Sequence, residues 1–336
     1  MKKRYLAAGA ALMLTAGLLA GCGSGEQPEE RRDAAQDNIQ DNADHGDQAA
    51  AYAPVTVDNY GREVTVEDKP SKVLTLGPNA SELFVALGLS DLVIGNSLDN
   101  HSRGALPEYE EAYARIPELT YGSATREAVV TSGADFIYGI DWEFGGDALD
   151  VEELAGLGMT TYMNSASTLE EMYGEIRDLG RIFEIEGEAE AFVADQQARI
   201  AAVQEQVGQR EAIDVLVYDS GGDGVFTAGA PNFETLLIEL AGGRNVFDDI
   251  EDQQWTTVSY EEVLRRQPEV IVIHDYDAPS LEQKIADIQA DPALSQLAAV
   301  QAERFVPISL ESVLPGGRMA YTVESLARGF YPELYQ

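Results

Sequence analysis

Short apolar runs that alternate with longer helical patterns constrain the fold of this chain more than any other feature. Each run has the length and the β-branched or aromatic content of a buried strand. Strands that alternate with helices predict parallel α/β layers. The runs are KVLTLGP (72–78), LVIGNS (92–97), ADFIYGI (134–140), TTYMNS (160–165), DVLVYDS (214–220), EVIVIHD (269–275) and RFVPIS (304–309), and the first helix is SELFVALG (81–88).

One stretch in the middle of the chain interrupts this alternation. Residues 186–209 contain no proline and place apolar side chains near helical spacing, so they predict a single long helix. The sequence therefore predicts an α/β fold with two lobes, residues 52–185 and 210–336, bridged by the helix 186–209.

The N-terminus has the pattern of an export signal. Three basic residues precede fifteen uncharged residues, a run too short to span a membrane comfortably, and we predict a signal peptide over residues 1–21. Cys22 is the only cysteine of the chain. The stretch Leu19–Cys22 resembles a bacterial lipobox, which implies cleavage before Cys22 and attachment of diacylglycerol to its sulfur.

The segment after this cysteine is polar and acidic. Residues 23–50 contain one large aliphatic side chain, Ile39, with eight acidic and two basic residues. Such a segment buries too little apolar surface to offset the entropy of ordering it. We predict that residues 22–51 form a disordered tether.

Charge and missing motifs exclude several functions. The chain has 22 basic and 59 acidic residues, a net charge of −37, so nucleic acid binding through a basic surface is not expected. It lacks a dinucleotide-binding glycine motif, a Walker A loop and the hydrolase motif G-x-S-x-G. Its three histidines, His45, His101 and His274, are too few for a histidine-based metal site. We expect neither an enzyme nor a protein with its own cofactor.

Acidic residues stand in the first turn of two predicted helices. Glu82 follows Asn79, and Glu261 and Glu262 follow Ser259. Asn79 with Glu82, and Ser259 with Glu262, could form capping boxes. Two acids on two lobes could instead contact a partner protein, and the spacing does not decide between these readings.

The whole chain past residue 54 resembles one family. The motifs are the lipobox, the tether, VTVDNYGREVTVEDKPSKVLTLGPNASELFVALGL (55–89), WTTVSYEEVLRRQPEVIVI (255–273) and LPGGRMAYTVESLARGFYPEL (314–334). Together they resemble the substrate-binding lipoproteins of ABC importers for iron-siderophores, heme and cobalamin. The resemblance implies Rossmann-like lobes, a cargo cleft between them, and a monomer anchored by its lipid at the outer face of the cytoplasmic membrane.

The resemblance also implies a protein partner. In this family an acid of each lobe docks onto arginines of the permease, which works with an ATPase, and these positions fall on Glu82 and Glu261. A role in capping alone remains the alternative for both residues.

The cleft is expected where the strands end, because ligands of open α/β sheets bind outside the carboxyl ends of the strands. Trp142, His274 and Tyr276 follow predicted strands, and aromatic side chains there offer flat contact area for a large cargo. By similarity to the family, Tyr121, Phe226 and Trp255 fall where pocket aromatics often stand; packing in the core is the alternative for each.

The expected cargo is a metal chelate. Arg318 begins the last helix, where a cation opposes the helix dipole, and the resemblance implies that it faces the cargo. A salt bridge to one of the many surface acids is the alternative. Arg103 and Arg126 are weaker candidates for cargo contact. Because so few cations are available to balance a strongly negative cargo, a ferric siderophore of low charge is expected, with cobalamin or another corrinoid, or heme, as alternatives.

His274 could contact a metal centre or be a hydrogen-bonded structural residue. A sensor or adhesion lipoprotein on the same scaffold stays open as another class.

Overall fold

The first lobe is built on a four-stranded parallel sheet. The computed structural model describes residues 51–145 and 149–335, so the predicted signal peptide, Cys22 and all of the tether but Ala51 lie outside the described residues. The strand order is β4-β3-β5-β6. The strands are β3 (Val73–Leu76), β4 (Val93–Ser97), β5 (Phe136–Ile140) and β6 (Thr160–Asn164), and the helices are α1 (Pro78–Ala86), α2 (Glu110–Tyr113), α3 (Arg126–Ser132), α4 (Val151–Gly156) and α5 (Leu169–Phe183).

The second lobe repeats this plan. Its parallel sheet has the order β10-β7-β12-β13, and a small antiparallel sheet of order β11-β9-β8 lies beside it. The strands are β7 (Ile213–Tyr218), β8 (Ser220–Gly221), β9 (Val225–Ala228), β10 (Gly243–Asn245), β11 (Trp255–Val258), β12 (Val270–Asp275) and β13 (Phe305–Ser309). The helices are α7 (Phe233–Leu240), α8 (Tyr260–Arg266), α9 (Leu281–Ala290), α10 (Ala298–Gln301), α11 (Leu310–Val313) and α12 (Met319–Phe330).

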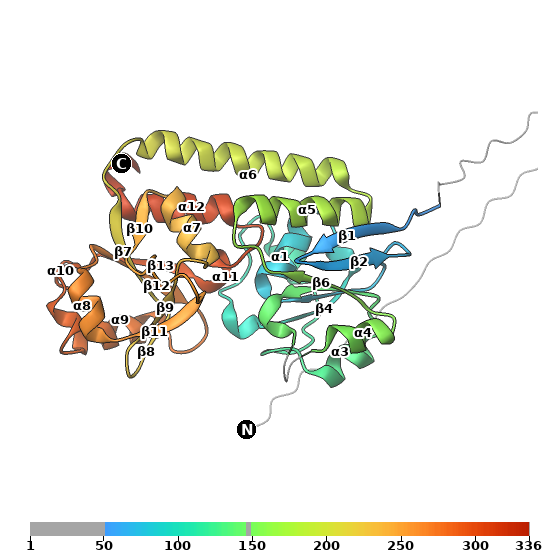
Figure 1. Cartoon of the computed structure of the whole chain (residues 1–336), viewed down its shortest axis with the longest axis horizontal. Coiled ribbons are helices and arrows are strands. Elements are labelled where there is room, and N and C mark those ends of the chain that lie inside the picture. The colour runs from blue at the N-terminus through green and yellow to red at the C-terminus, as the bar shows by residue number, and fades with distance from the viewer. Residues whose placement is uncertain (1–50, 146–148, 336) are drawn as a thin grey trace, which may run out of the picture. The chain divides into compact units, whose positions relative to one another are not determined.

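A single long helix connects the two lobes. Helix α6 (Glu186–Val207) packs along α5 of the first lobe and α12 of the second (Figure 1). Arg199 of α6 forms a bidentate salt bridge with Glu324 of α12, at 2.8 and 2.9 Å, and this pair joins the bridging helix to the second lobe. The helix ends at Gly208, whose φ of 64° favours glycine. The predicted two-lobe α/β fold with one bridging helix is confirmed; the exact limits of the lobes stay a prediction.

The central strands explain why the sheets are parallel. All five residues of β5 are buried, and so are the first five of β12, because helices cover both faces of each sheet. Helix α5 begins with a full capping box in which Thr168 and Glu171 satisfy each other's backbone donors. The seven predicted strands correspond to β3, β4, β5, β6, β7, β12 and β13.

An antiparallel hairpin, β1 (Val55–Asn59) with β2 (Arg62–Val66), precedes the first sheet and was not predicted. Its two-residue turn places Tyr60 at φ 56° and Gly61 at φ 80°, the pair of positive angles that such tight hairpins require. Single-turn 3₁₀ helices complete the fold at Ser90–Leu92, Asp99–His101, Asp141–Glu143, Leu294–Gln296 and Pro332–Tyr335. Among the described residues, no helix has both the length and the apolar character needed to cross a bilayer.

Candidate cargo pocket

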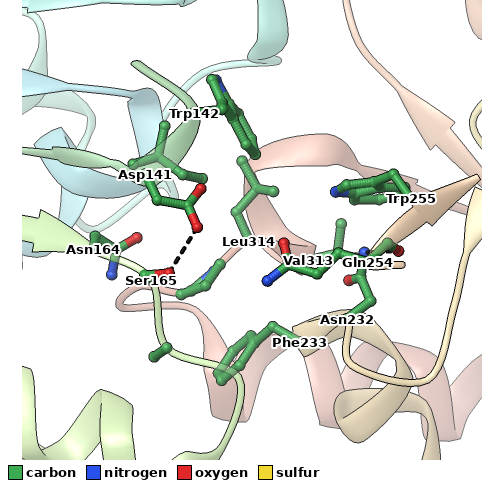
Figure 2. Close-up of a pocket in the computed structure, with 13 residues that line it drawn as sticks. Asp141, Trp142, Asn164, Ser165, Asn232, Phe233, Gln254, Trp255, Val313 and Leu314 are labelled. Carbon is green, nitrogen blue, oxygen red and sulfur yellow. Dashed lines mark hydrogen bonds between the residues drawn. The ribbon is translucent and has the colours of Figure 1, made fainter. Parts of the chain in front are cut away.

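A small pocket, with a cavity volume of about 20 Å³ and partly open to solvent, lies between the lobes (Figure 2). The first lobe contributes the ends of β5 and β6 with the residues that follow them, and the second contributes the N-terminus of α7 and the start of β11. The segment after α11 forms a third side. The polar and aromatic lining residues are Asp141, Trp142, Asn164, Ser165, Asn232, Phe233, Gln254 and Trp255.

Strand ends place the first-lobe wall. Asp141 follows β5 and Ser165 follows β6, and the Ser165 hydroxyl donates to Asp141 Oδ2 at 2.7 Å (Figure 2). Parallel strands end at one edge of the sheet, so their following residues meet there. In the second lobe, Asn232 caps α7 and its Nδ2 donates to the carbonyl of Gln254 at 2.9 Å, which joins the two parts of that wall.

The two tryptophans of the chain stand on opposite sides of this pocket (Figure 2). Trp142 is 41% exposed, so part of its side chain is open to solvent. Trp255 is half-buried and stacks on Phe226, with ring centroids 5.7 Å apart. Phe226 therefore packs against Trp255 and is not one of the lining residues, and its predicted contact with the cargo stays a prediction.

A buried carboxylate beneath the first-lobe wall was missed by the sequence analysis. Glu175 of α5 accepts hydrogen bonds from Tyr138 (2.7 Å), Asn164 (2.9 Å), the backbone of Ser165 (3.2 Å) and Tyr60. Burial raises the pKa of Glu175 to about 7, although these four donors favour the ionised form. The sequence pattern of this helix does not predict a buried carboxylate at Glu175, because the residues that donate hydrogen bonds to it come from three distant segments.

Tyr121 and Tyr276 lie near a second contact between the lobes and do not line the pocket. The Tyr121 hydroxyl donates to Asp277 Oδ2 at 2.7 Å across the lobes, and Tyr276 stacks on His101 at 5.9 Å. Tyr121 is half exposed. Their predicted contact with the cargo stays a prediction.

Arg318 is placed away from the pocket lining, buried between the lobes. Its guanidinium donates to Glu82 Oε1 at 2.6 Å, to Glu311 Oε1 at 3.2 Å and to the carbonyl of Gly104 at 2.7 Å. Arg318 is 6% exposed, and Glu82 and Glu311 are each 1% exposed. A salt bridge is present, but its acids are buried and not at the surface as the alternative expected, and the predicted contact of Arg318 with the cargo stays a prediction.

The two predicted docking acids differ sharply in environment. Glu82 is buried against Arg318, so it is not exposed on the surface in this arrangement of the lobes. Helix α1 has no side-chain cap, so Asn79 and Glu82 do not form the capping box. Glu261 is exposed in the first turn of α8. Ser259 caps that helix by accepting from the backbone of Glu262 at 3.2 Å, which leaves Glu261 out of the cap.

Arg103 and Arg126, the weaker candidates for cargo contact, each form a salt bridge with a carboxylate. Arg103 pairs with Asp275 at 3.3 Å, and Arg126 pairs with Glu153. Neither lines the pocket. Within the described part of the chain, no group of three or more histidine, cysteine or carboxylate side chains is arranged to hold a metal ion.

Two parallel α/β lobes, one bridging helix and a pocket between the lobes define a two-lobe ligand-binding protein. The chain belongs to the periplasmic binding protein family, whose model matches residues 73–309. This family supplies the substrate-binding subunits of ABC importers, which bind a small-molecule cargo outside the cytoplasm and work with permease and ATPase subunits.

Individual relatives agree with this assignment. An uncharacterized ABC transporter substrate-binding lipoprotein, YvrC of Bacillus subtilis, is 24% identical over the full length of both chains. A vitamin B12-binding protein of Pectobacterium carotovorum is 25% identical over 61% of this chain and 71% of its own. A crystal structure of a periplasmic binding protein from Veillonella parvula superposes with a TM-score of 0.74 at 25% identity, covering 83% of this chain and 98% of that one.

Proposed function

We propose that this protein is a lipid-anchored receptor that delivers a weakly charged metal chelate, a ferric hydroxamate siderophore first of all, to an ABC import permease. The observation that carries the proposal is the pair of tryptophans, Trp142 and Trp255, facing one pocket from opposite lobes (Figure 2). Large aromatic faces suit a bulky chelate whose outer surface is largely apolar.

The charge of the lining favours a cargo without strong negative charge. Among the described lining residues there is no arginine, lysine or histidine, and Asp141 is the one charged side chain. A ferric catecholate carries several negative charges and would be desolvated here without a compensating cation. The side-chain amide of Gln254 can donate to the oxygens of a ferric hydroxamate, a complex that is neutral overall. The Ser165 hydroxyl and the Asn232 amide already donate one hydrogen bond each, to Asp141 and to the carbonyl of Gln254.

The size of the pocket indicates how cargo enters. A cavity of about 20 Å³ is far smaller than a small-molecule site, which takes roughly 300 Å³ or more. A chelate or corrinoid therefore requires the lobes to move apart from the arrangement seen here, and the contacts of Tyr121 and Arg318 across the lobes are among those that opening would break.

Cobalamin is the second candidate, since several relatives of this chain are named vitamin B12-binding or cobalamin-binding proteins. A corrinoid also presents a broad, weakly charged face that two tryptophans could hold. Calorimetric titration with ferric hydroxamate, ferric catecholate, ferric citrate and cobalamin separates these cases. Saturable binding of the hydroxamate alone supports the proposal, binding of cobalamin alone replaces it with the second candidate, and binding of neither rejects both.

The internal repeat of the fold supports a revised docking pair. Helices α3 and α8 each lead into the third strand of their parallel sheet, β5 and β12, and each begins after a capping hydroxyl, Thr125 or Ser259. The second residue of α3 is Glu127 and that of α8 is Glu261, and both are exposed. We therefore assign docking to Glu127 and Glu261 in place of Glu82, with arginines of the permease as partners.

The lipid anchor is proposed from the sequence around Cys22. A relative of full matching length is named a lipoprotein, and the lipobox-like stretch precedes the only cysteine. Mass spectrometry of the N-terminal peptide is expected to show diacylglycerol on Cys22 and no residues before it; an unmodified thiol there would reject the anchor.

A further inference from the structure

The second-lobe wall rests on a buried imidazole held between two carboxylates. His274 is fully buried, with Nδ1 3.0 Å from Asp219 Oδ1 and Nε2 3.0 Å from Glu234 Oε2. Asp219 is 8% exposed and Glu234 is fully buried. With both ring nitrogens occupied and no exposed surface, His274 cannot contact a cargo or bind a metal without losing one of these partners.

This chain of three side chains joins the elements that form the pocket. Asp219 follows β7, His274 lies near the end of β12, and Glu234 is in the first turn of α7, next to the lining residues Asn232 and Phe233. The ring of Trp255 lies edge-on to His274 with centroids 5.8 Å apart. The network thus fixes the α7 N-terminus and also supports the tryptophan of the second-lobe wall.

Several charged or titratable side chains surround His274, and together they set its protonation state. Burial alone lowers the pKa of His274, but Glu234 and Asp219 outweigh it and raise the value to about 9. Lys284 of α9 donates to the His274 carbonyl at 2.8 Å and lies 3.6 Å from the ring centre of Tyr276. Burial lowers the pKa of Lys284 to about 8, while Asp219 and Asp275 oppose that shift. Tyr276 donates to Asp219 Oδ2 at 3.1 Å.

We infer that His274 is a positioning residue of the cargo pocket: as an imidazolium bridging Asp219 and Glu234, it holds Trp255 and the α7 N-terminus in the geometry that receives the cargo. The effect on cargo rests on the function proposed above; the effect on Trp255 does not. A binding wall fixed before the ligand arrives loses less freedom on binding, so loosening it lowers affinity even though His274 touches no ligand.

The first arm of the test needs no cargo. In the purified protein carrying Trp142→Phe, Trp255 is the single tryptophan. A protonated imidazole quenches a neighbouring indole more than a neutral one does. Trp255 emission is therefore expected to rise with a midpoint near pH 9, and this step should vanish in His274→Gln.

A second variant covers the case in which His274→Gln does not fold. Asp219→Asn keeps a hydrogen-bonding group at Nδ1 but removes one of the two negative charges, so the midpoint of the Trp255 step should fall by roughly one unit or more. The matched control is Glu239→Gln, which removes a carboxylate from the exposed side of the same helix, α7, and should leave the midpoint in place.

The second arm of the test measures the affinity of the protein for its cargo. For the chelate that the parent protein binds, His274→Gln and Asp219→Asn are expected to raise Kd by roughly tenfold or more, and Glu239→Gln to leave it unchanged. A lower unfolding temperature with an unaltered Trp255 pH profile and unaltered Kd would show that His274 serves stability alone, and would overturn the inference. If no chelate binds the parent protein, the proposed function fails, and the pH profile of Trp255 still decides the placement of His274.

Discussion

At the scale of single residues, Glu175 makes the first pocket wall sensitive to pH. Its folded-state pKa of about 7 lies above the ordinary glutamate value, so the folded protein holds this proton more tightly than the unfolded chain does. Its contribution to stability is therefore greatest below about pH 4.5 and is lost as pH rises through 7. At about 1.4 kcal/mol per pKa unit, the change is on the order of 3 kcal/mol.

Glu175→Gln, which cannot ionise, should flatten this part of the stability curve. Between about pH 5 and pH 8 the unfolding free energy of the parent protein is expected to fall relative to that of the variant, by roughly 2 to 3 kcal/mol. Denaturant unfolding at four pH values measures the difference. Parallel curves for the two proteins would mean that Glu175 is ionised throughout, held by its four donors.

Single residues also mark the limit of what the sequence predicts. Trp142, predicted from the strand-end rule, and Trp255, predicted from the family resemblance, both line the pocket between the lobes, and their contact with a cargo stays a prediction. Glu82 and Arg318, in contrast, are partners 236 positions apart, and no local pattern reports such a pair. In the sequence, Glu82 has the position of an acid in the first turn of an exposed helix, and Arg318 has that of a cation facing a cargo. The partner of each residue lies too far along the chain to be recognised.

At the scale of elements, strands with strong local signals were predictable and weakly marked ones were not. Strands β5 and β12 are continuous apolar runs, whereas β8 has two residues and depends on pairing with β9. The hairpin β1–β2 did carry a signal. Val55, Val57, Val64 and Val66 alternate with polar residues on either side of the turn, and the alternation is typical of a hairpin with one buried face.

Helices α3 and α8 carry the docking prediction. Glu127→Arg and Glu261→Arg, singly, should reduce cargo uptake by cells at least tenfold through charge repulsion with the permease, while cargo affinity of the purified protein is unchanged. Glu188→Arg on α6, which lies away from α3 and α8 (Figure 1), is the matched control and should leave uptake intact. Uptake unaffected by both reversals would exclude this pair.

At the scale of the whole described unit, Arg318 links the two lobes. Arg318→Met leaves Glu82 and Glu311 buried without their cation, and removal of one partner from such a group costs about 3 kcal/mol or more. We expect a lower unfolding temperature and, in small-angle X-ray scattering, a larger radius of gyration as the lobes separate. Adding Glu82→Gln removes one stranded charge and should recover part of the stability; no change in either quantity would show that the pair does not hold the lobes.

The central claim, that a metal chelate binds between two tryptophans from opposite lobes, is tested most directly by tryptophan fluorescence. The parent protein, Trp142→Phe and Trp255→Phe are titrated with ferric hydroxamate and with cobalamin, with free tryptophan amide as the control for light absorption by the ligand. The account predicts saturable quenching by one ligand with Kd at or below about 1 μM, equivalent to roughly 8 kcal/mol, and quenching of each remaining tryptophan in the two variants. Quenching no greater than that of the free amide, in all three proteins, would contradict it.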